Sequence, residues 1–242
     1  MIDKLKILGE SIARMVYPDV CPLCGKAIDG ENEYVCQECT VKLATINKPT
    51  CLKCGKALDS DEADCCTDCS TMQRHYIKGF PALGYNADMA KCLSDFKYHN
   101  MRCYGRFLAD VIVKQCGKDI LLVAPEVIVP VPVHKSKLKD RGYNQALVLA
   151  QELSLRLKIP VDDELIARDA KTTAQKGLNN QQREENLKRA FISSGKIVEY
   201  KRALIVDDIY TTGATIEACT GVLQGMGIKE IYYTSVCIGK GY

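Results

Sequence analysis

Two neighbouring carboxylates followed by a small, hydroxyl-rich turn form the first segment of this sequence that could do chemistry. The segment, VDDIYTTGAT at residues 206–215, continues an apolar run, ALIV, that predicts a buried strand. Carboxylates accept hydrogen bonds from hydroxyls or support hydrated Mg²⁺, and a small turn that opens a helix binds phosphate through free backbone N–H groups. A phosphate beside a vicinal diol describes a ribose 5-phosphate, so we expect such a site at Asp207 and Asp208.

A plainer interpretation of the same segment is a helix N-terminus. Thr212 or Thr215 would then cap the helix, and the two aspartates would lie on the surface near its positive end. We favour the ribose-phosphate interpretation because the acidic pair and the small turn occur together, directly after a hydrophobic strand.

Cysteine supplies a second kind of chemistry: the chain has 14 cysteines, and most of them lie between Cys21 and Cys69. This region is a duplication, in which CPLCGKAIDGENEYVCQEC is followed by CLKCGKALDSDEADCCTDC. Each copy holds two C-x2-C pairs, a spacing typical of tetrahedral zinc sites. The predicted zinc ligands are Cys21, Cys24, Cys36, Cys39, Cys51, Cys54, Cys66 and Cys69.

The duplication assigns Cys66, and not its neighbour Cys65, to a ligand position. Two connectivities stay open at this point. Either each copy binds its own ion, which we favour, or Cys21 and Cys24 share an ion with the first pair of the second copy. Four thiolates close the coordination sphere in both cases, so we expect two structural zinc ions. The cysteines after residue 69 stand apart and are interpreted as small core residues.

Composition sets the class of protein. With 242 residues, 47% of them hydrophobic, the chain can bury one main domain plus an accessory region, and its net charge of +3 does not by itself indicate nucleic-acid binding. Apolar residues at helical spacing predict an amphipathic helix over residues 1–20. We find no signal-peptide pattern and no membrane span, and we expect a cytoplasmic location, where thiols stay reduced.

From residue 78 onward the pattern alternates between strands and helices. This alternation predicts an α/β domain over residues 78–242, behind a cysteine-rich region over residues 21–72. Its sheet is expected to be mainly parallel, with ligands bound at the carboxyl ends of the strands. The predicted strands are 79–85, 127–133, 203–206 and 231–238, and the predicted helices are 89–99, 106–116, 144–157 and 214–227.

Several longer segments carry a family resemblance. LIVDDIYTTGAT resembles the 5-phosphoribosyl 1-pyrophosphate (PRPP) motif of type I phosphoribosyltransferases. CPLCG, FKYHNMRCYGRFLA, VPVPVHKSKLKDRGYNQA and TTAQKGLNNQQREENLKRAF occur in the order expected of the ComF family, also called competence protein F or ComFC. The resemblance covers most of the chain. It implies a type I phosphoribosyltransferase fold fronted by zinc fingers, and a role in DNA uptake during natural transformation.

The resemblance also implies roles for individual residues. Asp207 and Asp208 would bind the ribose hydroxyls, and Mg²⁺ would accompany the PRPP. The segment 171–187 matches a mobile lid, in which Gln175, Lys176 and Arg183 would cover pyrophosphate, and Lys176 and Arg183 would offset its charge during catalysis. The 5-phosphate loop would comprise Thr211, Thr212, Gly213, Ala214 and Thr215, and the pyrophosphate loop would comprise Val133, His134 and Lys135.

No residue in the sequence identifies the nucleobase that would accept the phosphoribosyl group. Hypoxanthine-guanine phosphoribosyltransferases carry an aspartate where Thr211 stands here, so purine salvage is disfavoured. His134 could be a general base, but we favour a positioning role because no partner is visible. Three functions are therefore considered: a ComF-type DNA-uptake protein that binds PRPP, with or without turnover; a metabolic phosphoribosyltransferase acting on a nucleobase; and a zinc-containing nucleic-acid-binding module with a vestigial PRPP site.

Charge distribution separates the candidate partners. Acidic residues outnumber basic ones between Cys21 and Cys69, whereas HKSKLKDR at residues 134–141 is basic. Single-stranded DNA is therefore expected to contact the phosphoribosyltransferase-like domain, around Lys137 and Lys139, unless this segment is simply a solvated loop. The zinc fingers would serve stability or a protein partner, such as the uptake helicase expected from the family.

Overall fold

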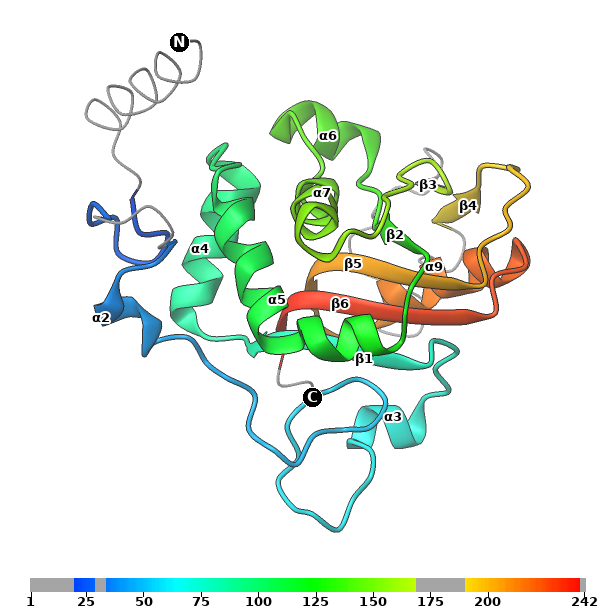
Figure 1. Cartoon of the computed structure of the whole chain (residues 1–242), viewed down its shortest axis with the longest axis horizontal. Helices are drawn as coiled ribbons and strands as arrows, with labels where there is room; N and C mark the ends of the chain where they lie inside the picture. The colour runs from blue at the N-terminus through cyan, green and yellow to red at the C-terminus, as the bar shows by residue number, and fades with distance from the viewer. Residues whose placement is uncertain (1–19, 29–33, 169–189, 240–242) are drawn as a thin grey trace, which may run out of the picture.

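A parallel sheet forms the centre of the molecule (Figure 1). The computed structural model describes residues 20–28, 34–168 and 190–239, and within them four strands pair in the order β1-β6-β5-β2. Each neighbouring pair is parallel, so the carboxyl ends of all four strands lie at one edge. The strands are β1 (Lys78–Gly84), β2 (Val127–Pro130), β5 (Arg202–Tyr210) and β6 (Glu230–Ile238).

Helices cover both faces of the sheet. Helices α5 and α7 pack together on one face, and α9 lies on the other face beside a small antiparallel hairpin. Side-chain caps fix where two helices begin: Asn86 accepts a hydrogen bond from Met89 N at 2.9 Å before α4, and Asn144 accepts one from Ala146 N at 3.1 Å before α7. The helices are α4 (Ala87–Tyr98), α5 (Tyr104–Leu122), α7 (Gln145–Leu157) and α9 (Ala214–Gly225).

Strand β5 shows how the core is divided. Successive side chains of a strand point to opposite faces, and all the residues from Ala203 to Val206 are fully buried. Leu204 and Val206 join the hydrophobic cluster that includes α4, α5 and α7, whereas Ala203 and Ile205 join the cluster that includes α9. A strand buried on both faces explains why its sequence is continuously apolar rather than alternating.

The two copies of the cysteine repeat lie on different sides of this core. We call residues 21–39 the first zinc unit and residues 51–69 the second zinc unit. Each ends in a short helix, α2 (Gln37–Thr40) or α3 (Thr67–Thr71). The first unit packs into the cluster of α4 and α5, and the second unit packs into the cluster of α9 (Figure 1).

The predicted strands and helices of residues 78–239 are present, with four main differences. Strand β2 ends at Pro130, three residues before its predicted end. Strand β5 does not end at Val206 but continues through the acidic pair to Tyr210. The basic segment expected to be a turn or a solvated loop forms helix α6 (Lys135–Arg141), because lysine, leucine and arginine favour helix. A hairpin of β3 (Ile166–Arg168) and β4 (Phe191–Ser193) had no sequence signal.

Two predictions lie outside the described residues: the helix over residues 1–20 and the lid residues Gln175, Lys176 and Arg183. Among the helices that the structure describes, none combines the length and the apolar character needed to cross a membrane.

Candidate functional site

The carboxyl ends of β2 and β5 open into a pocket of about 290 Å³. Residues from six different segments meet there, separated by up to 118 positions in the chain. The carboxylates are Asp207 and Asp208, the hydroxyls are Thr211 and Thr215, the amides are Asn144 and Gln145, and the basic side chains are Lys97, Lys137, Arg141 and Arg168. This position agrees with the general rule for ligand sites in parallel sheets.

The acidic pair lies inside the sheet rather than in the turn after it. Because Asp207 and Asp208 are consecutive on β5, their side chains leave opposite faces of the strand. Asp208 is only 7% exposed and forms an ion pair with Lys97 of α4. The Asp207 carboxylate accepts a hydrogen bond from the backbone N–H of Asp208 at 2.8 Å.

Burial, together with the nearby charge of Asp208, raises the pKa of Asp207 well above its ordinary value. The folded protein therefore holds this proton more tightly than the unfolded chain does. As a result, the contribution of Asp207 to stability falls as pH rises above the ordinary carboxyl range. A pocket residue whose ionisation destabilises the folded protein at neutral pH is typical of a binding site.

The turn between β5 and α9 has the geometry of an anion loop. Gly213, with a φ of +80°, precedes the first helical residue, and a Cβ there would lie 2.2 Å from the hydroxyl of Tyr210. No other residue fits this left-handed, crowded position. Gly213 occupies the N-cap position and has no side chain to cap α9, but Thr212 Oγ1 accepts a long hydrogen bond from Ala214 N at 3.5 Å, as the plainer interpretation expected in part. The next N–H groups of the first turn, those of Thr215 and Ile216, are available for a ligand.

Four basic side chains line the same pocket. Burial, followed by the charges of Arg141 and Arg168, lowers the pKa of Lys137. Burial also lowers the pKa of Arg168, whose Nε has no hydrogen-bond partner within the described residues. Cations that repel one another in this way favour an anion among them. The four cations outnumber the two carboxylates of the pocket, one of which already pairs with Lys97.

The structure brings together some of the predicted ligand-binding residues and not others. Thr211 and Thr215 line the pocket, whereas Thr212, Gly213 and Ala214 shape the loop behind it. Of the predicted pyrophosphate loop, Val133 lines the pocket, but His134 and Lys135 do not. His134 caps α6 instead, where its Nδ1 accepts a hydrogen bond from Ser136 N at 3.2 Å.

Three basic residues of the pocket were not assigned to it from the sequence. Lys97 lies within the segment FKYHNMRCYGRFLA, which carried the family resemblance, but nothing in its surroundings indicated a role. Lys137 was expected to contact DNA rather than line the pocket. Arg168 ends strand β3, which had no sequence signal. Arg141, which was ambiguous, hydrogen-bonds to Gln145 Oε1 at 3.0 Å and to Tyr98 Oη at 3.1 Å.

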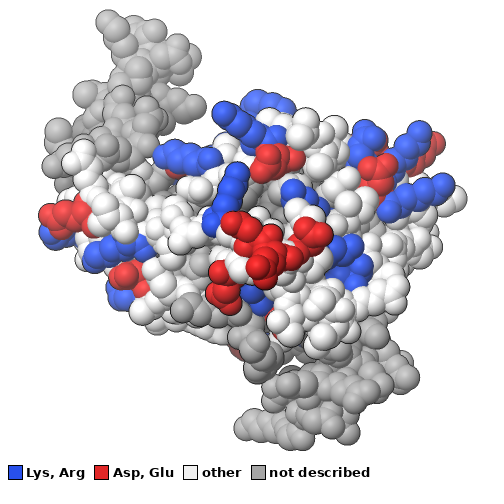
Figure 2. Space-filling model, turned by 90° about the horizontal axis from the view of Figure 1, so that it is seen from below, with Lys and Arg blue, Asp and Glu red and all other residues white. Residues whose placement is uncertain are grey.

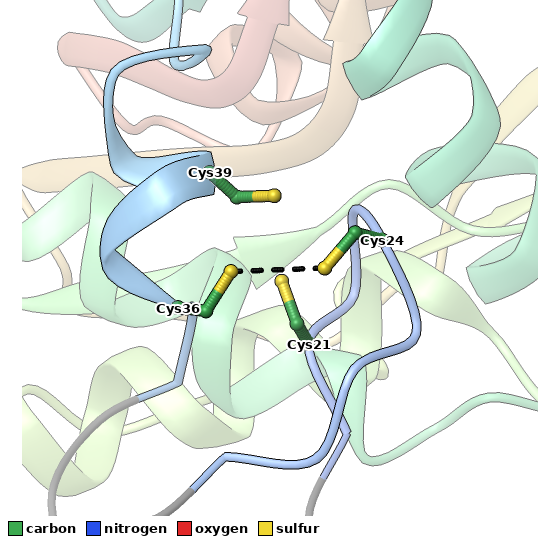
Figure 3. A group of neighbouring side chains, drawn as sticks. All are labelled: Cys21, Cys24, Cys36 and Cys39. Carbon is green, nitrogen blue, oxygen red and sulfur yellow. Dashed lines mark hydrogen bonds between the residues drawn. The ribbon is translucent and has the colours of Figure 1, made fainter.

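The predicted zinc ligands form two separate groups. The sulfur atoms of Cys21, Cys24, Cys36 and Cys39 lie within 4.8 Å of one another (Figure 3), and so do those of Cys51, Cys54, Cys66 and Cys69. The Sγ–Sγ distance is 3.6 Å between Cys24 and Cys36 and 3.7 Å between Cys54 and Cys66. A tetrahedral ion with Zn–S bonds of about 2.3 Å separates its sulfurs by about 3.8 Å, so both groups fit zinc.

The four cysteine sulfurs of each copy lie together, and this decides which cysteines share a zinc ion. Sequential pairing is the arrangement in the structure, and the alternative in which the two copies share ions is wrong. Cys65 belongs to neither group, as the duplication predicted. With four thiolates each, the two sites are structural rather than catalytic.

The fold and the site define a class of protein. Residues 12–70 match the double zinc ribbon domain, and residues 144–240 match the phosphoribosyl transferase domain. The chain is therefore a double zinc ribbon protein with a phosphoribosyltransferase fold, in which a parallel sheet is flanked by helices.

Relatives with known names narrow the class. The chain is 35% identical to competence protein F of Haemophilus influenzae over 153 residues, which are 61% of this chain and 66% of that protein. It is 34% identical to the DNA utilization protein YhgH of Escherichia coli K12 over 116 residues, 48% of this chain and 51% of that protein. It is 26% identical to the competence protein ComFC of Streptococcus pneumoniae over 151 residues, 61% of this chain and 62% of that protein.

These matches, together with the two domains, place the chain in the ComF family. The chain spans between about half and about two thirds of the length of these relatives.

Proposed function

We propose that this protein binds PRPP together with Mg²⁺ in the pocket at the ends of β2 and β5. One observation carries the proposal: a carboxylate pair, an anion loop and four cations line one pocket. PRPP offers a matching group to each, namely a ribose diol, a 5-phosphate and a pyrophosphate. The pocket volume of about 290 Å³ lies at the lower end of the range for small-molecule sites.

Each part of the pocket has a role in this complex. Asp207 and Asp208 accept hydrogen bonds from the ribose hydroxyls, and the N-terminus of α9 with Thr211 and Thr215 binds the 5-phosphate. The pyrophosphate lies near Lys97, Lys137 and Arg141. Bound Mg²⁺ would offset charge on the pyrophosphate, which favours its departure from the anomeric carbon.

Calorimetry with PRPP and Mg²⁺ tests this proposal on the zinc-loaded protein. Replacing both aspartates, Asp207→Asn with Asp208→Asn, should weaken binding at least about tenfold, because each lost charged hydrogen bond contributes roughly 1.5–3 kcal/mol. Asp110→Asn is the control, since among the described residues Asp110 forms an ion pair only with Lys114 of α5, at 2.8 Å. Ribose 5-phosphate should compete with PRPP, whereas ribose alone should not.

Two further measurements complete the test. Asp207→Asn alone should raise the melting temperature of the ligand-free protein at neutral pH, because it removes a buried carboxyl whose ionisation is unfavourable. Loss of binding in this variant then has a cause other than misfolding. The absence of any binding heat with the folded wild-type protein would sink the proposal. Base-dependent release of pyrophosphate would instead identify a metabolic phosphoribosyltransferase.

The names of the relatives suggest where such a protein acts, and we propose a role in DNA uptake that includes contact with single-stranded DNA. Helix α6 carries the exposed residues Lys135 and Lys139, whereas acidic side chains gather over the underside of the molecule (Figure 2). The exposed acids of the second zinc unit are Asp59, Asp61, Glu62 and Asp64. Phosphate contacts are therefore favoured at α6 and disfavoured at that unit.

Reversing two exposed charges that do not line the pocket, Lys135→Glu with Lys139→Glu, should weaken single-stranded DNA binding and reduce its salt slope by about 1.4. Lys137 is left intact because it lines the PRPP pocket. PRPP binding serves as the control and should not change. An unaltered DNA affinity and salt slope would exclude α6 as the contact surface.

A further inference from the structure

A short segment connects the second zinc unit to the phosphate loop. This bridge segment, residues 74–76, begins five positions after the last cysteine of the unit. Its three consecutive residues contact the loop or the two elements that the loop joins, β5 and α9. Neither the zinc ligands nor the lining of the PRPP pocket include it.

Arg74 holds the loop directly. The residue is 9% exposed, and its guanidinium donates a hydrogen bond to the carbonyl oxygen of Thr212 at 2.5 Å. Arg74 itself does not line the pocket. In a trans peptide the N–H of the following residue is antiparallel to the carbonyl, so the bond from Arg74 to Thr212 O also fixes the direction of the Gly213 N–H.

The other two bridge residues hold the flanks of the loop. The backbone N–H of His75 donates to both carboxylate oxygens of Glu217, at 3.0 and 3.2 Å, and its ring also pairs with this side chain. Glu217 lies in the first turn of α9. Tyr76 is fully buried, and its hydroxyl is 2.8 Å from the hydroxyl of Tyr210, the last residue of β5.

The second zinc unit in turn supports the bridge segment. Tyr233 of β6 donates to the carbonyl of Cys54 at 2.8 Å and stacks on Tyr210 with ring centroids 4.7 Å apart. Tyr76 packs edge-on against both rings, and Lys53 lies over its face. A continuous set of contacts therefore runs from a zinc ligand to the residue that begins the loop. The first zinc unit packs in the other core cluster, beside α4 and α5.

We propose that the second zinc unit is a structural part of the phosphate-binding loop, with Arg74 as the positioning residue that connects them. Zinc in the second unit, and not in the first, then sets the affinity of the pocket for a phosphate monoester. This inference rests on the proposed PRPP site and deepens it. It concerns the 5-phosphate end alone, because Lys97, Lys137 and Arg141 come from α4 and α6.

The first experiment uses Arg74→Gln in the full-length, zinc-loaded protein, with Arg156→Gln as the matched control. Arg156 also donates from its guanidinium to a backbone carbonyl, that of Arg106 at 3.3 Å, but near the first unit. In Arg74→Gln, affinity for ribose 5-phosphate should fall about tenfold, and affinity for pyrophosphate with Mg²⁺ should not change. Arg74→Lys should recover part of the loss, since a charged donor remains.

Hydrogen exchange of the loop amides at residues 211–216 tests the same inference without any ligand. We expect about tenfold faster exchange in Arg74→Gln than in the wild type or in Arg156→Gln. Unchanged exchange, or an equal loss of affinity for both ligands, would overturn the positioning role. Failure of the wild type to bind either ligand would reject the proposed function, while the exchange result would still decide the role of Arg74.

The matched pair Cys69→Ser and Cys39→Ser tests the zinc units themselves. These positions correspond in the duplication, and each variant should hold one zinc ion by elemental analysis. Faster exchange of the loop amides is expected in Cys69→Ser only. Equal loop exchange in the two variants would overturn the assignment to the second unit. If Cys69→Ser does not fold, the Arg74 variants still decide whether the loop is held from this side.

Discussion

The two zinc units share one local fold but differ in what surrounds them. In the first unit Cys21 N donates to Lys26 O at 2.8 Å, and in the second Cys51 N donates to Lys56 O at 2.7 Å. The glycines that follow, Gly25 and Gly55, have φ values of +75° and +76°. The same sequence pattern therefore produced the same backbone twice.

The two copies differ in the burial of one corresponding ion pair. The ion pair between Lys26 and Glu38 is 2.6 Å long, with side chains 61% and 72% exposed. Its counterpart between Lys56 and Asp68 has the same length, but the side chains are 12% and 24% exposed. The repeated motif thus determines the local geometry of each unit. Its contribution to the stability of the protein depends on what packs against it.

Removing one zinc ligand from each unit should give the largest contrast. Cys54 is buried against the sheet and Cys24 is exposed. Both Cys54→Ser and Cys24→Ser should reduce the zinc content by one ion. Cys54→Ser should lower the unfolding free energy of the main domain by several kcal/mol more than Cys24→Ser, since structural zinc contributes about 10–16 kcal/mol in zinc-finger peptides and Cys54 is the more buried ligand. Elemental analysis and urea denaturation measure both effects, and equal destabilisation would remove the distinction between the units.

Alanine at the paired glycines should give a smaller contrast. Both Gly55→Ala and Gly25→Ala force a side chain into a left-handed conformation, at about 1–2 kcal/mol. Only at Gly55 would the new Cβ also meet Pro81, whose Cδ lies 2.6 Å away, and such overpacking costs about 1–3 kcal/mol more. The difference between the two variants in thermal unfolding isolates the contact with the sheet. A difference of zero would show that the second unit is not held against β1.

The paired lysines should give the smallest contrast. Lys56→Met leaves the half-buried Asp68 without its cation, and we expect a loss of about 1–3 kcal/mol, between the values for surface and buried pairs. Lys26→Met should leave the unfolding transition unchanged, because solvent screens that pair. Chemical denaturation of both variants at low and high salt would measure the contrast. A loss in Lys26→Met that disappears at high salt would contradict it.

Local patterns in the sequence predicted the strands, most helices and the zinc ligands. Apolar runs such as ALIV are long enough to identify buried strands, and spacing identified each cysteine of the two groups. The predicted end of β5 was wrong for a physical reason. Asp207 pairs with Ser235, and Tyr210 with Ile238, so the backbone ladder continues beyond the apolar side chains. Backbone hydrogen bonding does not require a hydrophobic residue.

The cations of the pocket could not be predicted in the same way. Lys97 and Arg168 reach Asp207 and Asp208 only after α4 and the β3–β4 hairpin have packed on the sheet. Each residue taken alone resembles any surface lysine or arginine. The duplication also gave no sign that Arg74 would contact Thr212, because that contact depends on which face of the sheet the second unit covers.

The position of β6 has a consequence for how the chain acquires its fold during synthesis. This strand lies between β1 and β5, so the described sheet stays incomplete until residues 230–238 have left the ribosome. The hydrogen bond between Cys54 and Tyr233 joins residues 179 positions apart, a distance translated in about 10–35 seconds. During that interval the second zinc unit can hold its metal but cannot dock. Early metal capture would then protect its thiols from oxidation while its docking surface is still being made.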